Sequence, residues 1–119
     1  MRNDRENIIV NLTTTFALKI IAYSEYLEQK GKLVVARQLL RSGTAIGAMV
    51  REAQNAESKA DFIHKFKIAA KEADETSYWL VLCKEANTYP DPDQSLIAGL
   101  EDVSKIITKI IATSKVNKA

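Results

Sequence analysis

The residues best placed to do chemistry are three arginines on one predicted helix, Arg37, Arg41 and Arg51. At 100° per residue they fall on a single stripe, with small uncharged residues between them. Guanidinium groups bind phosphates well, so the stripe predicts contact with a nucleic-acid backbone, with Lys59 and Lys65 extending it along the next helix. The same pattern is typical of a solvated helix face, or of ion pairs with Glu52 and with carboxylates on another helix.

Residue types that catalyse reactions or bind metals are present, but not in working combinations. Paired metal sites inside helix bundles use two Glu-x-x-His motifs, and His64 is the only histidine. Cys83 is the only cysteine and has no histidine near it, which predicts a small buried side chain. Glu72 and Glu75 could form an acid–base pair, but carboxylates three apart on a helix are commoner as surface charges. The sequence predicts no enzyme, no catalytic residue, no metal site, no cofactor and no small-molecule substrate.

Composition sets the broad class of the protein. The chain has 119 residues, 46% of them apolar and 27% charged, which is typical of a globular domain. Its net charge of +2 permits a nucleic-acid partner without requiring one. No apolar run approaches the length of a membrane span, and the first residues lack the apolar core of a secretory signal. We therefore expect one cytoplasmic domain over residues 1–119 with no membrane association.

Four elements must position these residues, because apolar residues recur at steps of three and four. The first helix presents one apolar face, formed by Ile8, Leu12, Phe16, Ile20, Tyr23 and Leu27, and ends at Gly31. The second is predicted from about Leu33 to Asn55. The third starts after an N-cap at Ser58, with Asp61 in the capping-box position, and runs to about Thr88.

The fourth helix is predicted after the loop "YPDPDQ", with Asp91 as N-cap and Pro92 at the first helical position. Its apolar residues follow a 4-3-4-3 spacing through Leu96, Leu100, Val103, Ile107 and Ile110. Connections of a few residues make neighbouring helices antiparallel. The fold class is therefore all-α, an up-down-up-down antiparallel four-helix bundle.

Two glycines interrupt the second helix on its predicted core face. Gly43 and Gly47 are four residues apart, on the side that also holds Leu40 and Val50, and each costs a helix interior about 1 kcal/mol relative to alanine. They could admit a ligand or a nucleic-acid backbone. We favour packing, in which the missing side chains let a neighbouring helix approach closely.

A second apolar face on the third helix predicts self-association. Ile68, Trp79 and Leu82 cluster there, with Glu72 and Glu75 between them. A bundle helix contacts two neighbours, so this face could be a wide core face. The fourth helix is also broadened by further isoleucines, which is more apolar surface than one bundle needs. We therefore expect a homo-oligomer, with Ile68, Trp79 and Leu82 at its interface.

The run "RQLLRSGTAIGAMVREA", followed by "SKADFIHKFKIAAKEADETSYWL", resembles the four-helix bundle family of proteins encoded in intervening sequences of bacterial 23S ribosomal RNA genes. The first run matches the family pattern at Arg41, Ser42, Ile46, Gly47, Glu52 and Ala53, and the second at Ser58, Lys59, Asp61, Phe62, Ala69, Glu72 and Glu75. Met49 departs from it, since the family often has Asn there.

The resemblance implies a homopentamer and membership of a family with no established catalytic activity. A related branch, the accessory proteins of diversity-generating retroelements, is basic and binds nucleic acid, whereas this chain is nearly neutral. Our first hypothesis is a non-enzymatic oligomer that binds RNA or a nucleoprotein through Arg37, Arg41 and Arg51, with Lys59 and Lys65. The alternative is a protein–protein interaction scaffold with no nucleic-acid role.

Overall fold

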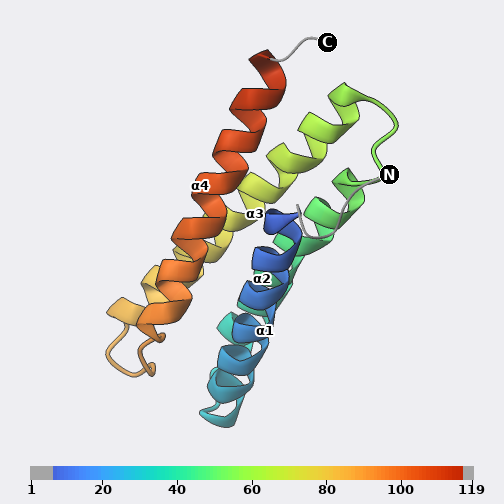
Figure 1. The fold of residues 1–119 in the computed structure, drawn as a ribbon. Coiled ribbons are helices and arrows are strands. Elements are labelled where there is room, and N and C mark those ends of the chain that lie inside the picture. The colour runs from blue at the N-terminus through green and yellow to red at the C-terminus, as the bar shows by residue number, and fades with distance from the viewer. Residues whose placement is uncertain (1–6, 117–119) are drawn as a thin grey trace.

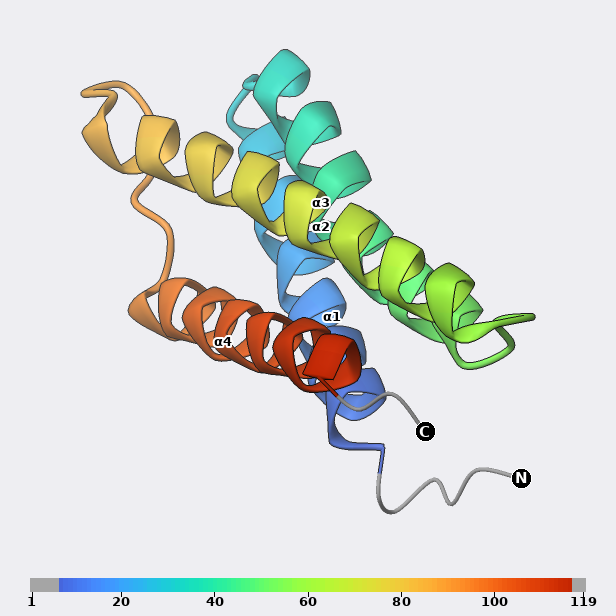
Figure 2. The ribbon, with the colours of Figure 1, turned by 90° about the horizontal axis from the view of Figure 1, so that it is seen from above.

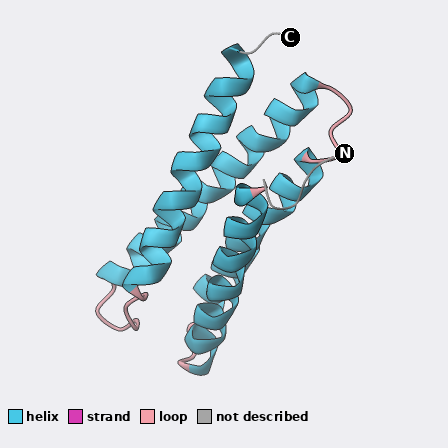
Figure 3. Cartoon of the chain, in the orientation of Figure 1, coloured by secondary structure: helices cyan, strands magenta, loops and turns pink. Residues whose placement is uncertain are grey.

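A computed structural model of the chain describes residues 7–116, which form helices and connecting loops without a strand (Figure 3). The helices of this range are α1 (Ile8–Gln29), α2 (Leu33–Ala53), α3 (Lys59–Glu85) and α4 (Gln94–Val116). Both α2 and α3 end two or three residues earlier than predicted. The single domain predicted over residues 1–119 includes nine residues, 1–6 and 117–119, that lie outside the described range.

The helices run alternately up and down and pack in a ring, α1 against α2, α2 against α3, α3 against α4 and α4 against α1 (Figures 1 and 2). The predicted antiparallel four-helix bundle is therefore confirmed. One end of the bundle carries the α1–α2 turn and the α3–α4 loop, and we call it the α1–α2 end. The other, where α2 turns into α3, is the α2–α3 end (Figure 1).

Local capping fixes where the helices stop and start. Gly31 has a φ of 80°, and its N–H bonds to the Glu28 carbonyl oxygen, as in a Schellman motif. Ser58 caps α3 as predicted, because its Oγ accepts a hydrogen bond of 3.0 Å from the Asp61 N–H. The N-cap predicted for α4 was wrong. α4 begins at Gln94, and the carboxylate of Asp93, two residues after Asp91, accepts the bond from the Ser95 N–H at 3.3 Å.

The core stripe of α1 is partly rotated from the predicted one. Phe16, Ile20, Tyr23 and Leu27 are buried as expected, but Ile8 is 60% exposed, and Ile9 and Thr13 are buried. Each step of four residues turns a helix by 40° beyond a full circle. The steps from Ile20 back to Ile8 are all of four residues, so they leave the core face, whereas Ile9 is reached through a step of three.

The glycines of α2 bring its backbone against α1, which confirms the packing interpretation. A Cβ atom built on Gly43 would lie 2.8 Å from both Cγ atoms of Ile20, and one on Gly47 would lie 3.3 Å from Thr13 Cβ. Leu40 was wrongly placed on this core face, because it is 37% exposed. The adjacent Leu39 occupies the core, and one residue along a helix turns the side chain by 100°.

The predicted seam of α4 closes the other side of the core. Leu96, Leu100, Val103 and Ile107 are buried, and Ile110 is half-buried. Gly99 brings α4 close to α1, since a Cβ atom there would lie 3.5 Å from Phe16 Cδ1. The packing of the bundle thus determines which polar residues of α2, α3 and α4 face outward.

Candidate nucleic-acid and self-association surfaces

A buried hydrogen bond joins α2 and α3 on the inner side of the candidate sites. Thr76 Oγ1 on α3 lies 2.8 Å from Ser42 Oγ on α2, and 2.8 Å from the carbonyl oxygen of Glu72. Both hydroxyl groups are buried, so each needs a partner to offset the loss of water. This hydrogen bond fixes how α2 and α3 are aligned along each other. It thereby brings Arg41 on α2 level with Glu72 and Glu75 on α3.

Arg41 spans the α2–α3 junction and binds two carboxylates. Its Nη2 lies 2.6 Å from Glu75 Oε1 and 3.1 Å from Glu72 Oε1. The second oxygen of Glu75 accepts a hydrogen bond of 2.9 Å from Trp79 Nε1. Hydrogen bonds from Trp79 and then Arg41 lower the pKa of Glu75, and those carboxylates raise the pKa of Arg41. This cluster carries one positive and two negative charges, so it corresponds to the ion-pair interpretation of Arg41.

The remaining cations of the predicted nucleic-acid site are dispersed. Lys65 Nζ lies 3.7 Å from Glu52 Oε1 and 3.5 Å from Asp61 Oδ1. Arg51 leans towards α1, where its Nη2 donates to Thr14 Oγ1 at 3.3 Å. Two further cations, Arg37 and Lys59, are exposed and have no ion pair within residues 7–116. The arginine stripe therefore divides, with Arg41 turned to α3 and Arg51 to α1.

The predicted interface residues of α3 differ in their exposure. Ile68 and Trp79 are half-buried, and Trp79 also packs against the core, whereas Leu82 is 36% exposed. Apolar side chains that are more exposed than Leu82, and that were not predicted as interface residues, lie towards the α1–α2 end: Leu33 and Val34 on α2, Tyr78 and Val81 on α3. Val34 is 74% exposed and Tyr78 57%. The sequence does contain a signal for them, because both pairs of apolar residues lie off the predicted core stripe of their own helix.

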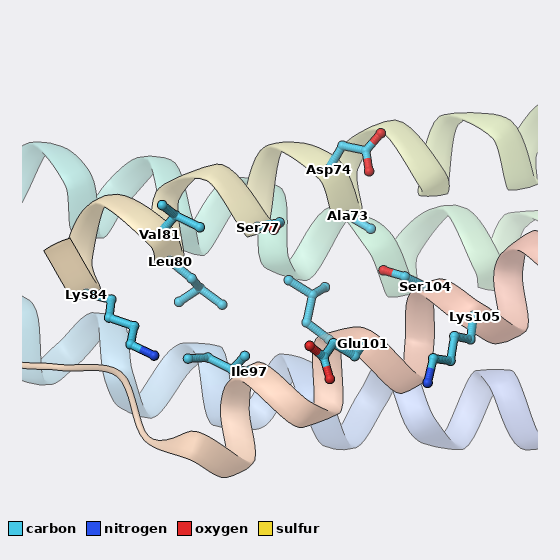
Figure 4. A pocket seen from close by; sticks show the side chains of 11 residues that line it. Ala73, Asp74, Ser77, Leu80, Val81, Lys84, Ile97, Glu101, Ser104 and Lys105 are labelled. Atoms are coloured by element: carbon cyan, nitrogen blue, oxygen red, sulfur yellow. The ribbon is translucent and has the colours of Figure 1, made fainter.

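A groove of about 590 Å³ runs between α3 and α4 (Figure 4). Leu80 of α3 and Ile97 of α4 project into it, while charged side chains stand along its edges, namely Asp74, Lys84, Glu101 and Lys105. Small residues on the facing sides, such as Ser77, leave this space open. Sequence analysis did not identify the groove, because it depends on how two helices separate rather than on any one helix.

The cysteine and the metal-binding residue types form no reactive cluster within residues 7–116. Cys83 is buried as predicted, next to Tyr23, and burial raises the pKa of both groups. The thiol is therefore kept protonated near neutral pH. Tyr23 donates a hydrogen bond of 2.6 Å to the Pro90 carbonyl oxygen, which ties the α3–α4 loop to α1. In the described part of the chain, no three His, Cys, Asp or Glu residues are placed to hold a metal ion.

Among the described residues, none of the helices has an apolar stretch that could span a membrane.

No curated protein matches the chain. A crystal structure from Bacteroides thetaiotaomicron, of a protein with unknown function from the S23 ribosomal protein family, is similar to it. The two are 37% identical, the match covers 87% of this chain and 97% of that one, and the TM-score is 0.82.

The model of one protein family also matches, and its description is 23S rRNA-intervening sequence protein. The match extends over residues 5–109, which is most of the chain and includes α1, α2 and α3 in full. Neither this description nor that of the similar structure names a catalytic activity. By its fold, its motifs and this match, the chain belongs to the family of 23S rRNA-intervening sequence proteins.

Proposed function

We propose that this protein is a non-enzymatic bundle of the cytoplasm that assembles into a homo-oligomer, a pentamer by the family resemblance, and associates with RNA or a nucleoprotein. Its outward-facing residues support binding rather than catalysis. The charged side chains at the α2–α3 junction are bonded to one another, and the thiol is buried and protonated. Association with other macromolecules is the use that such a surface supports best.

The observation that carries self-association is the set of large exposed apolar side chains near the α1–α2 end, Leu33 and Val34 on α2 and Tyr78 and Val81 on α3. It continues on α3 into Leu82, next to the predicted interface residue Trp79. Exposed apolar side chains leave water when a second surface covers them, which stabilises an assembly by about 25 cal/mol for each Å² buried.

Sedimentation velocity tests this assembly directly. We expect a species of about five times the 13.3 kDa of one chain. The double variant Val34→Lys/Val81→Lys should dissociate it, because charges would have to be buried at the interface. Val116→Lys is the matched control, since Val116 is 79% exposed at the other end of the bundle. A wild-type mass of one chain at all concentrations would refute the assembly. Equal effects of both variants would show that the interface does not lie at Val34 and Val81.

Association with RNA is supported by the family description and by the free cations of the predicted site. Arg37 and Lys59 have no ion pair among the described residues, and Arg51 donates to a neutral hydroxyl group there. In a pentamer these groups would be repeated five times. Replacing Arg37, Arg41 and Arg51 by glutamine tests whether this stripe contributes, and unchanged RNA affinity would exclude it.

The engagement of Arg41 and Lys65 by carboxylates favours a second candidate, a protein–protein scaffold. A phosphate would have to displace Glu72 and Glu75 to reach Arg41. Affinity purification from lysate, with and without nuclease, separates the two functions. Partners that disappear after nuclease treatment support RNA association, and partners that remain support the scaffold.

A further inference from the structure

A second group of cations free of ion pairs in the described chain lies outside the arginine stripe, towards the α2–α3 end. Lys67 and Lys71 lie on α3, and Lys105 and Lys109 lie on α4; we call these four residues the lysine face. All four are exposed, and none is within ion-pair distance of a carboxylate in residues 7–116. The N-terminal half of α3 and the C-terminal half of α4, which carry them, both lie towards the α2–α3 end (Figure 1).

The spacing of the lysine face is regular. The two lysines on each helix are four residues apart, so they project from the same side of the helix, about 6 Å apart along its axis. The antiparallel packing of α3 and α4 sets these two pairs on adjacent helices (Figures 1 and 2). Lys105 also borders the α3–α4 groove, at the end where Asp74 stands on α3 (Figure 4).

The local charge balance separates this surface from the arginine stripe. Residues 62–71 of α3 and residues 103–116 of α4 contain no aspartate or glutamate. In the arginine stripe, in contrast, Arg41 is already bound by Glu72 and Glu75. In a chain of net charge +2, these four positive charges have no carboxylate within ion-pair distance among the described residues, and a polyanion gains from binding at such a site.

We propose that the lysine face contacts the phosphate backbone of RNA. This inference rests on the proposed RNA association and names the surface responsible for it. A lysine ammonium group binds phosphate as a point charge and requires no fixed geometry, so exposed and unconstrained lysines suit this role. The large exposed aromatic residues of the described chain, Tyr26 and Tyr78, lie outside this surface. The contact therefore follows the backbone rather than stacking on bases, and its sequence preference is weak.

The test compares two variants of equal charge. The first replaces Lys67, Lys71, Lys105 and Lys109 by glutamine. The control makes the same change at four exposed or half-exposed lysines that lie outside both proposed sites, Lys19, Lys30, Lys32 and Lys84. Both variants lose four positive charges, so any difference between them reports position rather than net charge. Circular dichroism and sedimentation first establish that each retains the helical fold and the assembly state of the wild type.

Binding of a fluorescent oligouridine of about 20 nucleotides is then measured from about 50 to 200 mM salt. Each phosphate that a protein neutralises on a single strand adds about 0.7 to the steepness of the log–log plot, so the lysine-face variant should have a slope shallower by about three. Its affinity near 100 mM salt should fall at least about tenfold, and the control should stay within about threefold of wild type. An oligothymidine of the same length should behave as the RNA does.

The outcomes separate the proposal from the function on which it rests. Wild-type protein that binds no oligouridine even at about 50 mM salt would refute RNA association, and the lysine face with it. Wild-type binding that the control variant weakens as much as the lysine-face variant would refute the lysine face alone. Loss confined to the arginine variant Arg37→Gln/Arg41→Gln/Arg51→Gln would place the contact on the stripe instead.

Discussion

The two glycines of α2 should respond differently to alanine, although they lie on the same side of the same helix. An alanine Cβ at position 43 would lie 2.8 Å from two carbon atoms of Ile20, which is fully buried. One of these atoms or the α1 backbone must shift, and overpacking of this kind costs about 1–3 kcal/mol. An alanine Cβ at position 47 would lie 3.3 Å from Thr13, a contact that a shift of a few tenths of an ångström relieves.

The intrinsic helix preference of alanine offsets these costs by about 1 kcal/mol at each site. Gly43→Ala should therefore destabilise the protein by up to about 2 kcal/mol, whereas Gly47→Ala should be neutral within about 0.5 kcal/mol or slightly stabilising. Because both substitutions add the same methyl group to the same helix, Gly47→Ala is the matched control for propensity.

Urea unfolding followed by circular dichroism measures both free energies, at a fixed protein concentration because assembly contributes to apparent stability. At this domain size the loss at position 43 corresponds to a lower Tm by roughly 4 °C for each kcal/mol. A Gly43→Ala protein as stable as Gly47→Ala would show that α1 and α2 are not in close contact at Ile20, and would refute the packing account of the glycines.

Three further substitutions test individual contacts. Tyr23→Phe removes the hydrogen bond to the Pro90 carbonyl oxygen and should lower the free energy of unfolding by about 1 kcal/mol, measured by urea titration. Ser58→Ala removes the N-cap of α3 and should lower the free energy of unfolding by about 1 kcal/mol in the same assay. An unchanged urea midpoint would contradict this prediction. Glu75→Gln breaks an exposed ion pair and should cost less than about 1 kcal/mol at pH 7. Hydrogen bonds from Trp79 and then Arg41 lower the pKa of Glu75 from its ordinary value of 4.5, so their stabilisation is present above that pH and is lost as the pH falls below it. Thermal melts of wild type and Glu75→Gln should therefore converge at low pH and not at high pH.

The sequence was sufficient to predict the bundle because its signals are local. Apolar spacing, the glycine at position 31 and the cap at Ser58 each act within one or two helical turns, and the structure confirms all three. Prediction was less reliable at the edges of each stripe. Ile8 and Leu40 were placed on core faces, yet they are exposed, because a rotation of 100° separates them from the residues that neighbouring helices cover.

The candidate sites depend on contacts between helices, which sequence periodicity does not specify. The stripe predicted Arg37, Arg41 and Arg51 as equivalent, but lateral packing of α2 on α3 brings Glu72 and Glu75 to Arg41 alone. Similarly, the lysine face is split between α3 and α4, about 40 residues apart in sequence, so no local pattern links its halves. The sequence gives one local indication of the lysine face, because residues 62–71 and 103–116 contain no aspartate or glutamate. The fold then places these two segments on adjacent helices.

The salt dependence of RNA binding by the wild-type protein tests the central claim most directly. If the protein is an RNA-associated oligomer, log affinity for oligouridine should fall linearly with log salt between about 50 and 200 mM, with a slope that corresponds to several phosphate contacts. No binding at the lowest salt, or affinity that does not depend on salt, would contradict the account and leave a protein–protein scaffold as the function of this bundle.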